Sequence, residues 1–323
     1  MRGREAKGVE TFLRVVYALV ALAMLTGTPA RAMEKNVVIL GTATPGGGFP
    51  VYGAAFAEAV NEADPSLEVR PRTTKGSTEN IPLLEAGKLD IALVQGEVAH
   101  EVLSSDSGLK IIAAMYSSAG MFAVRADSSA RSIRDLVGKP VIFGARGSGL
   151  VVLARHVLDG MGLDPDSDFK AIYLDRVSDA PQMILDRHAA ALWGGGVGWP
   201  AFEAVAKDPV GARFIVPSAE EISRIIAKRP FLRRLTVPAR SYPGQESPIT
   251  SVGSWSFVLA RPSFPDDIAY RLARALHRSE AALGARLPQA RETTLANTRA
   301  AAPRQDLIHP GVVKYMREAG IIP

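Results

Sequence analysis

The chain has 323 residues, of which 47% are hydrophobic, with 38 basic residues, 33 acidic residues and no cysteine. It is long enough for two ordinary domains, and the absence of cysteine excludes disulfides, thiol nucleophiles and cysteine-ligated metals. The net charge of +5 is small, and no basic stripe with interleaved aromatic residues indicates nucleic-acid binding.

The first 32 residues have the pattern of a secretory signal peptide. Basic residues precede an apolar run over 15–25, and Ala30-Arg31-Ala32 is a small-residue cleavage signal. The alternative is a membrane anchor, but the run is shorter than the ~20 residues that a spanning helix needs. Because residues 1–32 hold five basic and two acidic groups, cleavage after Ala32 leaves 33 basic and 31 acidic residues. We therefore expect an exported, periplasmic protein with a net charge of +2.

Short apolar strands then alternate with helical segments. In chain order we expect a strand at 37–40, a helix at 54–61, a strand at 67–73, a helix at 77–86 and a strand at 91–94. A β-α-β-α-β order predicts a parallel sheet with helices on both faces.

The same order repeats in the second part of the chain. Strands are expected at 110–116, 121–124, 169–174, 189–193 and 254–260, and 133–144 is expected to form a short helix, a turn and a strand. Further helices are expected after 149, at 180–187, at 265–283 and at 312–319. The repeat predicts an α/β protein of two similar lobes. We expect lobe I to comprise 33–122 plus 253–323 and lobe II to comprise 123–252. The crossings are predicted near 118–125 and 248–258.

A glycine-rich turn, Gly46-Gly47-Gly48, separates the first strand from the first helix. Glycine lets backbone N–H groups approach a ligand closely, and the helix N-terminus behind it favours negative charge. A dinucleotide-binding fingerprint is excluded because the three glycines are contiguous and the next is Gly53. A tight turn without a ligand is the remaining alternative.

Similar polar loops follow later strands. Thr74, Ser77 and Asn80 lie at the next helix start, Gln95 follows the third strand, and Arg146 and Ser148 occupy the matching loop of the second lobe. The loop after Trp193 is again glycine-rich. Parallel strands bring such loops to one edge of a sheet, where ligands bind. The alternatives are helix capping for the 74–80 segment, a solvent-facing position for Arg146 and core packing for Trp193.

Catalytic and metal-binding patterns are missing from the sequence. There is no G-x-S-x-G elbow, and the five histidines show neither an H-E-x-x-H motif nor paired spacing. We interpret His309, before Pro310-Gly311, as a structural loop residue, with an exported hydrolase or isomerase as the alternative. The chain is therefore predicted to be no enzyme and to carry no cofactor or metal.

Taken in order, these motifs resemble the TAXI-type solute-binding proteins of TRAP transporters. The resemblance covers nearly all of the mature chain and rests on Gly46–Gly53, 74–80, 84–95, Gly147-Ser148-Gly149 and His309-Pro310-Gly311. It implies a periplasmic binding protein of the two-lobe, type II-like fold, with the ligand cleft between the lobes. It also implies a monomer that closes on a small organic anion, such as glutamate, a dicarboxylate or a 2-oxo acid, and delivers it to a membrane permease.

The loops and the resemblance together give a set of candidate ligand-binding residues. The family often has Gly-Gly-Thr-Tyr-Tyr-Pro-Leu-Gly where this chain has Gly46-Gly47-Gly48-Phe49-Pro50-Val51-Tyr52-Gly53. Two hydroxyls are therefore lost from this loop, and the identity of the ligand stays open. The rival interpretations are a subunit of an ABC importer and a ligand-sensing protein. The candidates are Gly47, Gly48, Phe49, Tyr52, Thr74, Ser77, Asn80, Gln95, Arg146, Ser148, Trp193, Gly194 and Gly195.

Overall fold

The computed structural model describes residues 35–323, and the predicted signal peptide, 1–32, lies outside them. The first predicted unit is confirmed. β1 pairs in parallel with both β2 and β3, so the β-α-β-α-β segment forms a parallel set of three strands. Its elements are β1 (Asn36–Gly41), α2 (Gly48–Ala63), β2 (Leu67–Arg72), α3 (Ser77–Glu85) and β3 (Ile91–Val94).

Helix α2 begins earlier than the sequence predicted. It starts at Gly48 rather than at Ala54, because Pro50 is tolerated in a first helical turn, where its missing N–H has no intrahelical partner. Tyr52, Phe56 and Val60 then bury one face of the helix. The loop between β1 and α2 is consequently short, and the helix N-terminus lies directly behind the glycines.

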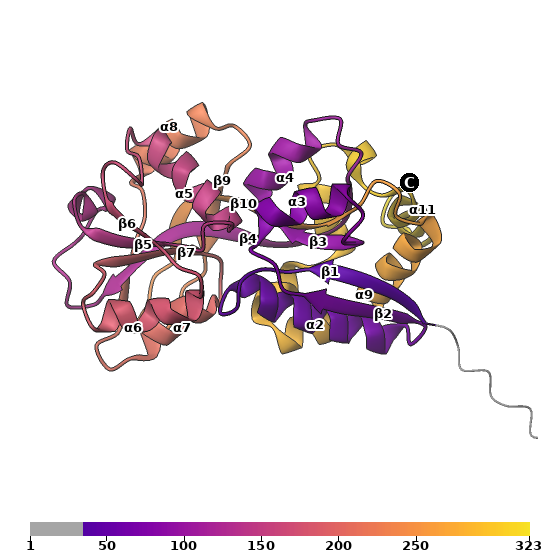
Figure 1. Ribbon diagram of the computed structural model, residues 1–323, viewed down its shortest axis with the longest axis horizontal. Helices are drawn as coiled ribbons and strands as arrows, with labels where there is room; N and C mark the ends of the chain where they lie inside the picture. Colours follow the sequence, from indigo (N-terminus) through magenta and orange to yellow (C-terminus); the bar gives the residue numbers. More distant parts are fainter. Residues whose placement is uncertain (1–34) are drawn as a thin grey trace, which may run out of the picture. The chain divides into compact units, whose positions relative to one another are not determined.

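Strand β4 (Lys110–Arg125) is continuous where two strands were predicted. Ser117-Ser118 and Gly120 looked like a break, but the strand runs through them because it is paired on both sides of that point. Up to Ala119 it pairs antiparallel with β10 (Ile249–Ala260), and from Gly120 onward it pairs with β7 (Ala191–Gly195) and β8 (Ala212–Ile215). β4 therefore joins the two parallel sets of strands (Figure 1).

The second parallel set is β5 with β6 and β7. β5 (Pro140–Gly144) pairs in parallel with β6 (Lys170–Tyr173) and with β7, and β9 (Arg233–Val237) pairs with β10. The full order is β2-β1-β3-β10-β4-β7-β5-β6, with β8 on β4 and β9 on β10. The associated helices are α5 (Gly149–Gly160), α6 (Ala180–Leu185), α7 (Pro200–Lys207) and α8 (Ala219–Lys228).

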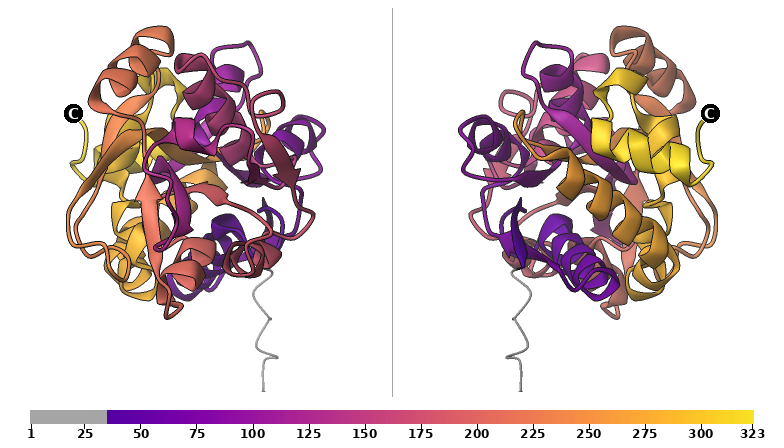
Figure 2. Two further views of the ribbon diagram at one scale, coloured as in Figure 1. Left: turned by 90° about the vertical axis from the view of Figure 1, so that its left-hand side faces the viewer. Right: turned by 90° about the vertical axis from the view of Figure 1, so that its right-hand side faces the viewer.

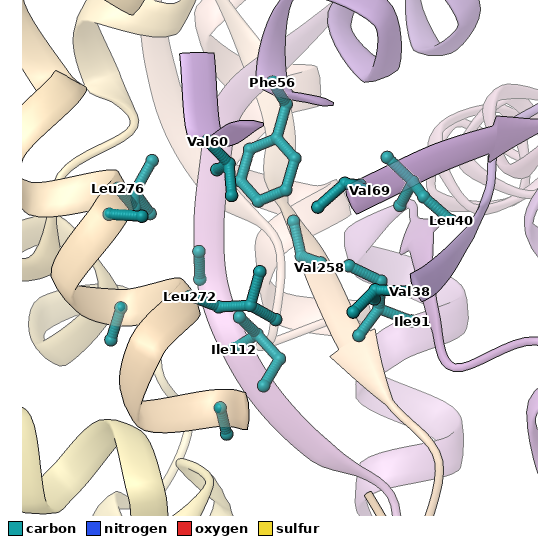
Figure 3. Packing of buried hydrophobic residues seen from close by; sticks show 14 of the residues in the cluster. Val38, Leu40, Phe56, Val60, Val69, Ile91, Ile112, Val258, Leu272 and Leu276 are labelled. Atoms are coloured by element: carbon teal, nitrogen blue, oxygen red, sulfur yellow. The ribbon is translucent and has the colours of Figure 1, made fainter. Parts of the chain in front are cut away.

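The buried side chains form separate cores along the chain. Two clusters draw on residues 38–116 and 257–316, and two draw on residues 119–252. In the first of them Phe56 and Val60 of α2 gather with Leu272 and Leu276 of α9 (Asp266–Arg286) beside the strands (Figure 3). This separation is what two lobes require, although the boundaries at 122/123 and 252/253 stay a prediction.

The C-terminal helices complete the first core. α9 (Asp266–Arg286) lies beside α2 and also packs against α11 (Pro310–Glu318), an arrangement visible in Figure 2. α4 (Gly96–Leu103) and α10 (Leu295–Ala301) cover neighbouring strands. Between Lys35 and Pro323, no helix combines the length and apolar composition needed to cross a membrane.

Candidate ligand-binding site

A cavity of about 50 Å³ lies where the loops after β1, β2, β3, β5 and β7 meet. The wider space between the lining residues, which includes volume open to solvent, is about 620 Å³. An enclosed volume of this size holds more than one water-sized group, since one water needs roughly 10–15 Å³ by the same measure. The position is the carboxyl edge of both parallel sets, which is where open α/β sheets bind ligands.

Most of the predicted site residues line this cavity. They come from both parts of the chain, since the first five belong to loops of the first strand set and the others to loops of the second. The lining candidates are Gly47, Gly48, Phe49, Ser77, Gln95, Ser148, Trp193 and Gly195.

Three other candidates support the site from behind. Asn80 donates from Nδ2 to the carbonyls of Thr42 and Leu93, both at 2.9 Å, and Thr74 Oγ1 donates to Thr42 O at 3.1 Å. The Tyr52 hydroxyl is buried at 3.2 Å from Thr293 Oγ1. These side chains hold the ends of the strands and are not among the residues that line the cavity.

Arg146 and Gly194 are also outside the cavity lining. The Arg146 guanidinium is exposed and lies 4.7 Å above the ring of Tyr173, so it is directed to a neighbouring strand. Gly194 accommodates the Trp199 ring, because a Cβ there would be 2.2 Å from it. The structure therefore does not bring Arg146 to the other predicted ligand-binding residues.

Several lining residues were missed by the sequence reasoning. Tyr116 and Ser118 lie on β4, and Phe143, Val177 and Trp199 supply further wall. The available signal was the polar stretch after Met115 in an otherwise apolar strand, which we interpreted as a break between strands. Pairing with β10 on both sides of a register shift between Ser117 and Ala114 instead places Tyr116 and Ser118 at the centre of the molecule's sheet.

The polar groups around the cavity are arranged as donors. Ser77 Oγ accepts from Gln95 N at 2.9 Å, and Ser148 Oγ accepts from Leu150 N at 3.2 Å. Each hydroxyl hydrogen is free to donate to a ligand, and one lone pair on each oxygen also remains. Gln95 is 2% exposed, its Oε1 accepts from Ser256 Oγ at 3.2 Å, and its Nε2 makes no hydrogen bond of normal geometry.

Helix N-termini add to this donor character. Gly47, Gly76 and Trp199 are the N-cap residues of α2, α3 and α7; none makes a side-chain cap bond, and all three line the cavity. The first N–H groups of a helix lack intrahelical partners and carry partial positive charge. The convergence of these helix starts favours an anionic group at the centre of the cavity.

Behind Gln95 lies a buried acid, Glu97, which is 2% exposed. Its Oε1 accepts from Ser254 Oγ at 2.6 Å, whereas Oε2 makes no hydrogen bond. Burial raises the pKa of Glu97 to about 7, and hydrogen bonds from Ser254, its own backbone and the nearby Gln95 side chain only partly oppose that rise. Within residues 35–323, no group of three or more histidine or acidic side chains is placed to hold a metal ion.

His309 has a structural role in the helix cap of α11. Its Nδ1 accepts from Gly311 N at 3.2 Å, so Nε2 carries the proton and donates to Phe264 O at 3.1 Å. The ring is 2% exposed and does not line the cavity. Both ring nitrogens are thus engaged by backbone groups, which leaves none for the general-base role considered from the sequence.

The strand order and the position of the cavity define the class of fold. The protein has the mixed α/β fold of the two-lobe periplasmic substrate-binding proteins, as predicted, with antiparallel β4 and β10 added to the parallel sets. The chain belongs to the NMT1-like family, whose model matches residues 40–320.

Solved structures share this fold at low sequence identity. An ancestral arginine-binding protein bound to arginine is 14% identical, with a TM-score of 0.50 over 80% of this chain and 99% of that one. A protein from Bordetella bronchiseptica RB50 is 15% identical, with a TM-score of 0.54 over 90% of this chain and 83% of that one. Full-length BenM is 11% identical, with a TM-score of 0.50 over 88% of this chain and 79% of that one.

Proposed function

We propose that this protein is an exported solute-binding protein that captures a small organic anion in the cavity and carries out no chemistry on it. The observation that carries the proposal is the convergence of hydrogen-bond donors and helix N-termini from both parts of the chain on one cavity. A site made of donors, with no nucleophile paired to a base, suits recognition rather than catalysis.

Closure of the two predicted lobes is the proposed mechanism. Thr78 Oγ1 donates to Gly147 O at 3.0 Å, which links α3 to the loop before α5. Glycines allow the closest approaches between the same parts: a Cβ on Gly46 would be 2.4 Å from Ser178 N, and one on Gly149 would be 2.2 Å from Gln95 Cβ. A ligand that bonds to both sides of the cavity stabilises this closed arrangement over an open one.

The delivery partner is proposed from the motifs and the predicted signal peptide. We expect a periplasmic monomer that passes its ligand to the membrane permease of a TRAP-type transporter. An ABC importer is the second candidate, because the same fold serves both. The genes next to this one distinguish them, since a permease without an ATPase supports the first and an ATPase supports the second.

Isothermal titration of the mature chain, 33–323, tests the proposed function. The titrants are amino acids, dicarboxylates, monocarboxylates and 2-oxo acids, and small-angle scattering follows closure. Thr78→Val removes the side-chain hydrogen bond to Gly147 O, leaves the 3.3 Å backbone bond from Thr78 N, and should weaken ligand binding about fivefold. Thr73→Val, at an exposed position of the same segment, is the matched control. Absence of binding to every titrant, or of any change in scattering on binding, would contradict capture by closure.

A further inference from the structure

The hydrogen-bond polarity of the cavity restricts the ligand further. Ser77 and Ser148 each use one lone pair to accept from a backbone N–H group, and each keeps its hydroxyl hydrogen to donate to a ligand. Gln95 also lines the cavity, and its buried Nε2, close to Glu97, makes no hydrogen bond of normal geometry. Within the described chain the Tyr116 hydroxyl, at the same wall, also makes no hydrogen bond. These groups match a carboxylate, which only accepts.

The charge of the lining restricts the ligand in a second way. Among the lining residues of the described chain, none has a charged side chain. An α-ammonium group entering the cavity would lose its hydration with no carboxylate to pair with it. Glu97 does not supply one, because it lies outside the lining and its Oε1 is already bonded by Ser254. A second carboxylate would likewise find no lysine or arginine.

Apart from the hydroxyls of Thr44 and Ser118 and the backbone groups of the glycines, the remaining wall is apolar. Its aromatic and aliphatic side chains bury a ligand's carbon skeleton but cannot satisfy another polar group. The residues concerned are Phe49, Phe143, Leu150, Val177, Trp193 and Trp199.

We infer that the ligand is a small monocarboxylate with an apolar body, and that the site rejects α-amino acids and dicarboxylates. This inference rests on the proposed function and selects one class among the anions considered there. The single carboxylate lies among the donors of Ser77, Gln95 and Ser148. The carbon body lies against the aromatic wall.

A matched set of compounds tests this class by isothermal titration of the mature chain. 3-Methylbutanoate is the reference, L-valine adds an α-ammonium, 2-methylsuccinate replaces a methyl with a second carboxylate, and 3-methylbutanamide removes the charge. We expect 3-methylbutanoate to bind at least about 100-fold more tightly than L-valine or 2-methylsuccinate, the penalty of an unpaired buried charge. The amide should bind about tenfold more weakly.

The variants separate specificity from folding. Gln95→Met, which removes the donor but keeps the length, should weaken 3-methylbutanoate at least about tenfold. Gln182→Met, at an exposed position on α6, is the control and should change nothing. Tyr116→Phe gives a second test, because it deletes only a hydroxyl and should also weaken the carboxylate more than the amide.

The outcomes distinguish this inference from the proposed function. Tighter binding of L-valine, L-glutamate or 2-methylsuccinate would overturn the monocarboxylate class while leaving solute capture intact. If none of the set binds, native mass spectrometry of the freshly purified protein gives the formula of a retained ligand. A monocarboxylic acid supports the inference, an amino acid or dicarboxylic acid overturns it, and a bare polypeptide overturns the proposed function as well.

Discussion

Glu97→Gln should make the protein more stable at alkaline pH than the natural chain. The Glu97 carboxyl is buried, and its Oε1 accepts from Ser254 Oγ at 2.6 Å. Burial raises the pKa of this carboxyl from an ordinary 4.5 to about 7. Ionising it in the folded state therefore costs about 3 kcal/mol. Glutamine keeps the oxygen that accepts from Ser254 and never ionises.

Whether stability rises or falls with pH depends on whether the folded or the unfolded chain binds more protons. Below pH 4.5 both states hold the proton; between 4.5 and about 7 the unfolded chain releases it while the folded chain keeps it. The stability of the natural protein thus falls as pH rises through that window and stays lowered above it. The Glu97→Gln variant lacks this loss, so its stability relative to the natural chain should rise by about 3 kcal/mol between pH 4 and pH 8.

Urea unfolding of both proteins at several pH values measures this difference. Glu101→Gln, at an exposed position on the same helix α4, controls for loss of a carboxylate as such and should show no pH-dependent gain. The proposed cost of ionising Glu97 is wrong if the difference in unfolding free energy between Glu97→Gln and the natural chain stays constant from pH 4 to pH 8. It is also wrong if the variant becomes less stable relative to the natural chain as pH rises.

Two further substitutions test other parts of the fold. Asp64 accepts from Arg271 at 3.1 Å and Arg274 at 3.3 Å; the Arg271 hydrogen bond holds the pKa of Asp64 well below its usual range. Asp64→Asn should cost about 2 kcal/mol at pH 7, and the cost should shrink as pH falls below about 4. A pH-independent cost in urea unfolding, with exposed Asp106→Asn as control, argues against this role. His309→Ala should cost about 1 kcal/mol at pH 8 through the lost helix cap. Because burial lowers the pKa of His309, that cost should decrease below about pH 6.5. If thermal unfolding shows that the cost of His309→Ala increases below that pH, the ring is not neutral in the folded protein.

Local signals in the sequence predicted the features that depend on local chemistry. Ser77 and Ser148 begin helices directly after glycine-rich turns, and both line the cavity. The parallel sets follow from apolar strands alternating with helices, a pattern that does not depend on distant residues. The meeting of loops from both parallel sets at one cavity was therefore predictable.

The features that sequence reasoning missed depend on contacts between distant segments. The direction of Arg146 is decided by Tyr173, a residue of the neighbouring strand β6. β4 continues through Ser117-Ser118 because β10, more than 130 residues later, pairs with it there. A polar stretch in an apolar run indicates a break when read alone, and only the long-range pairing shows that Tyr116 and Ser118 face the cavity.

Native mass spectrometry of the mature protein, freshly purified and then incubated with small acids, tests solute capture most directly. We expect one small organic acid per chain, released on unfolding and retained less by Gln95→Met than by Gln182→Met. A mass equal to that of the bare polypeptide under both conditions would contradict the proposal that this cavity binds a solute.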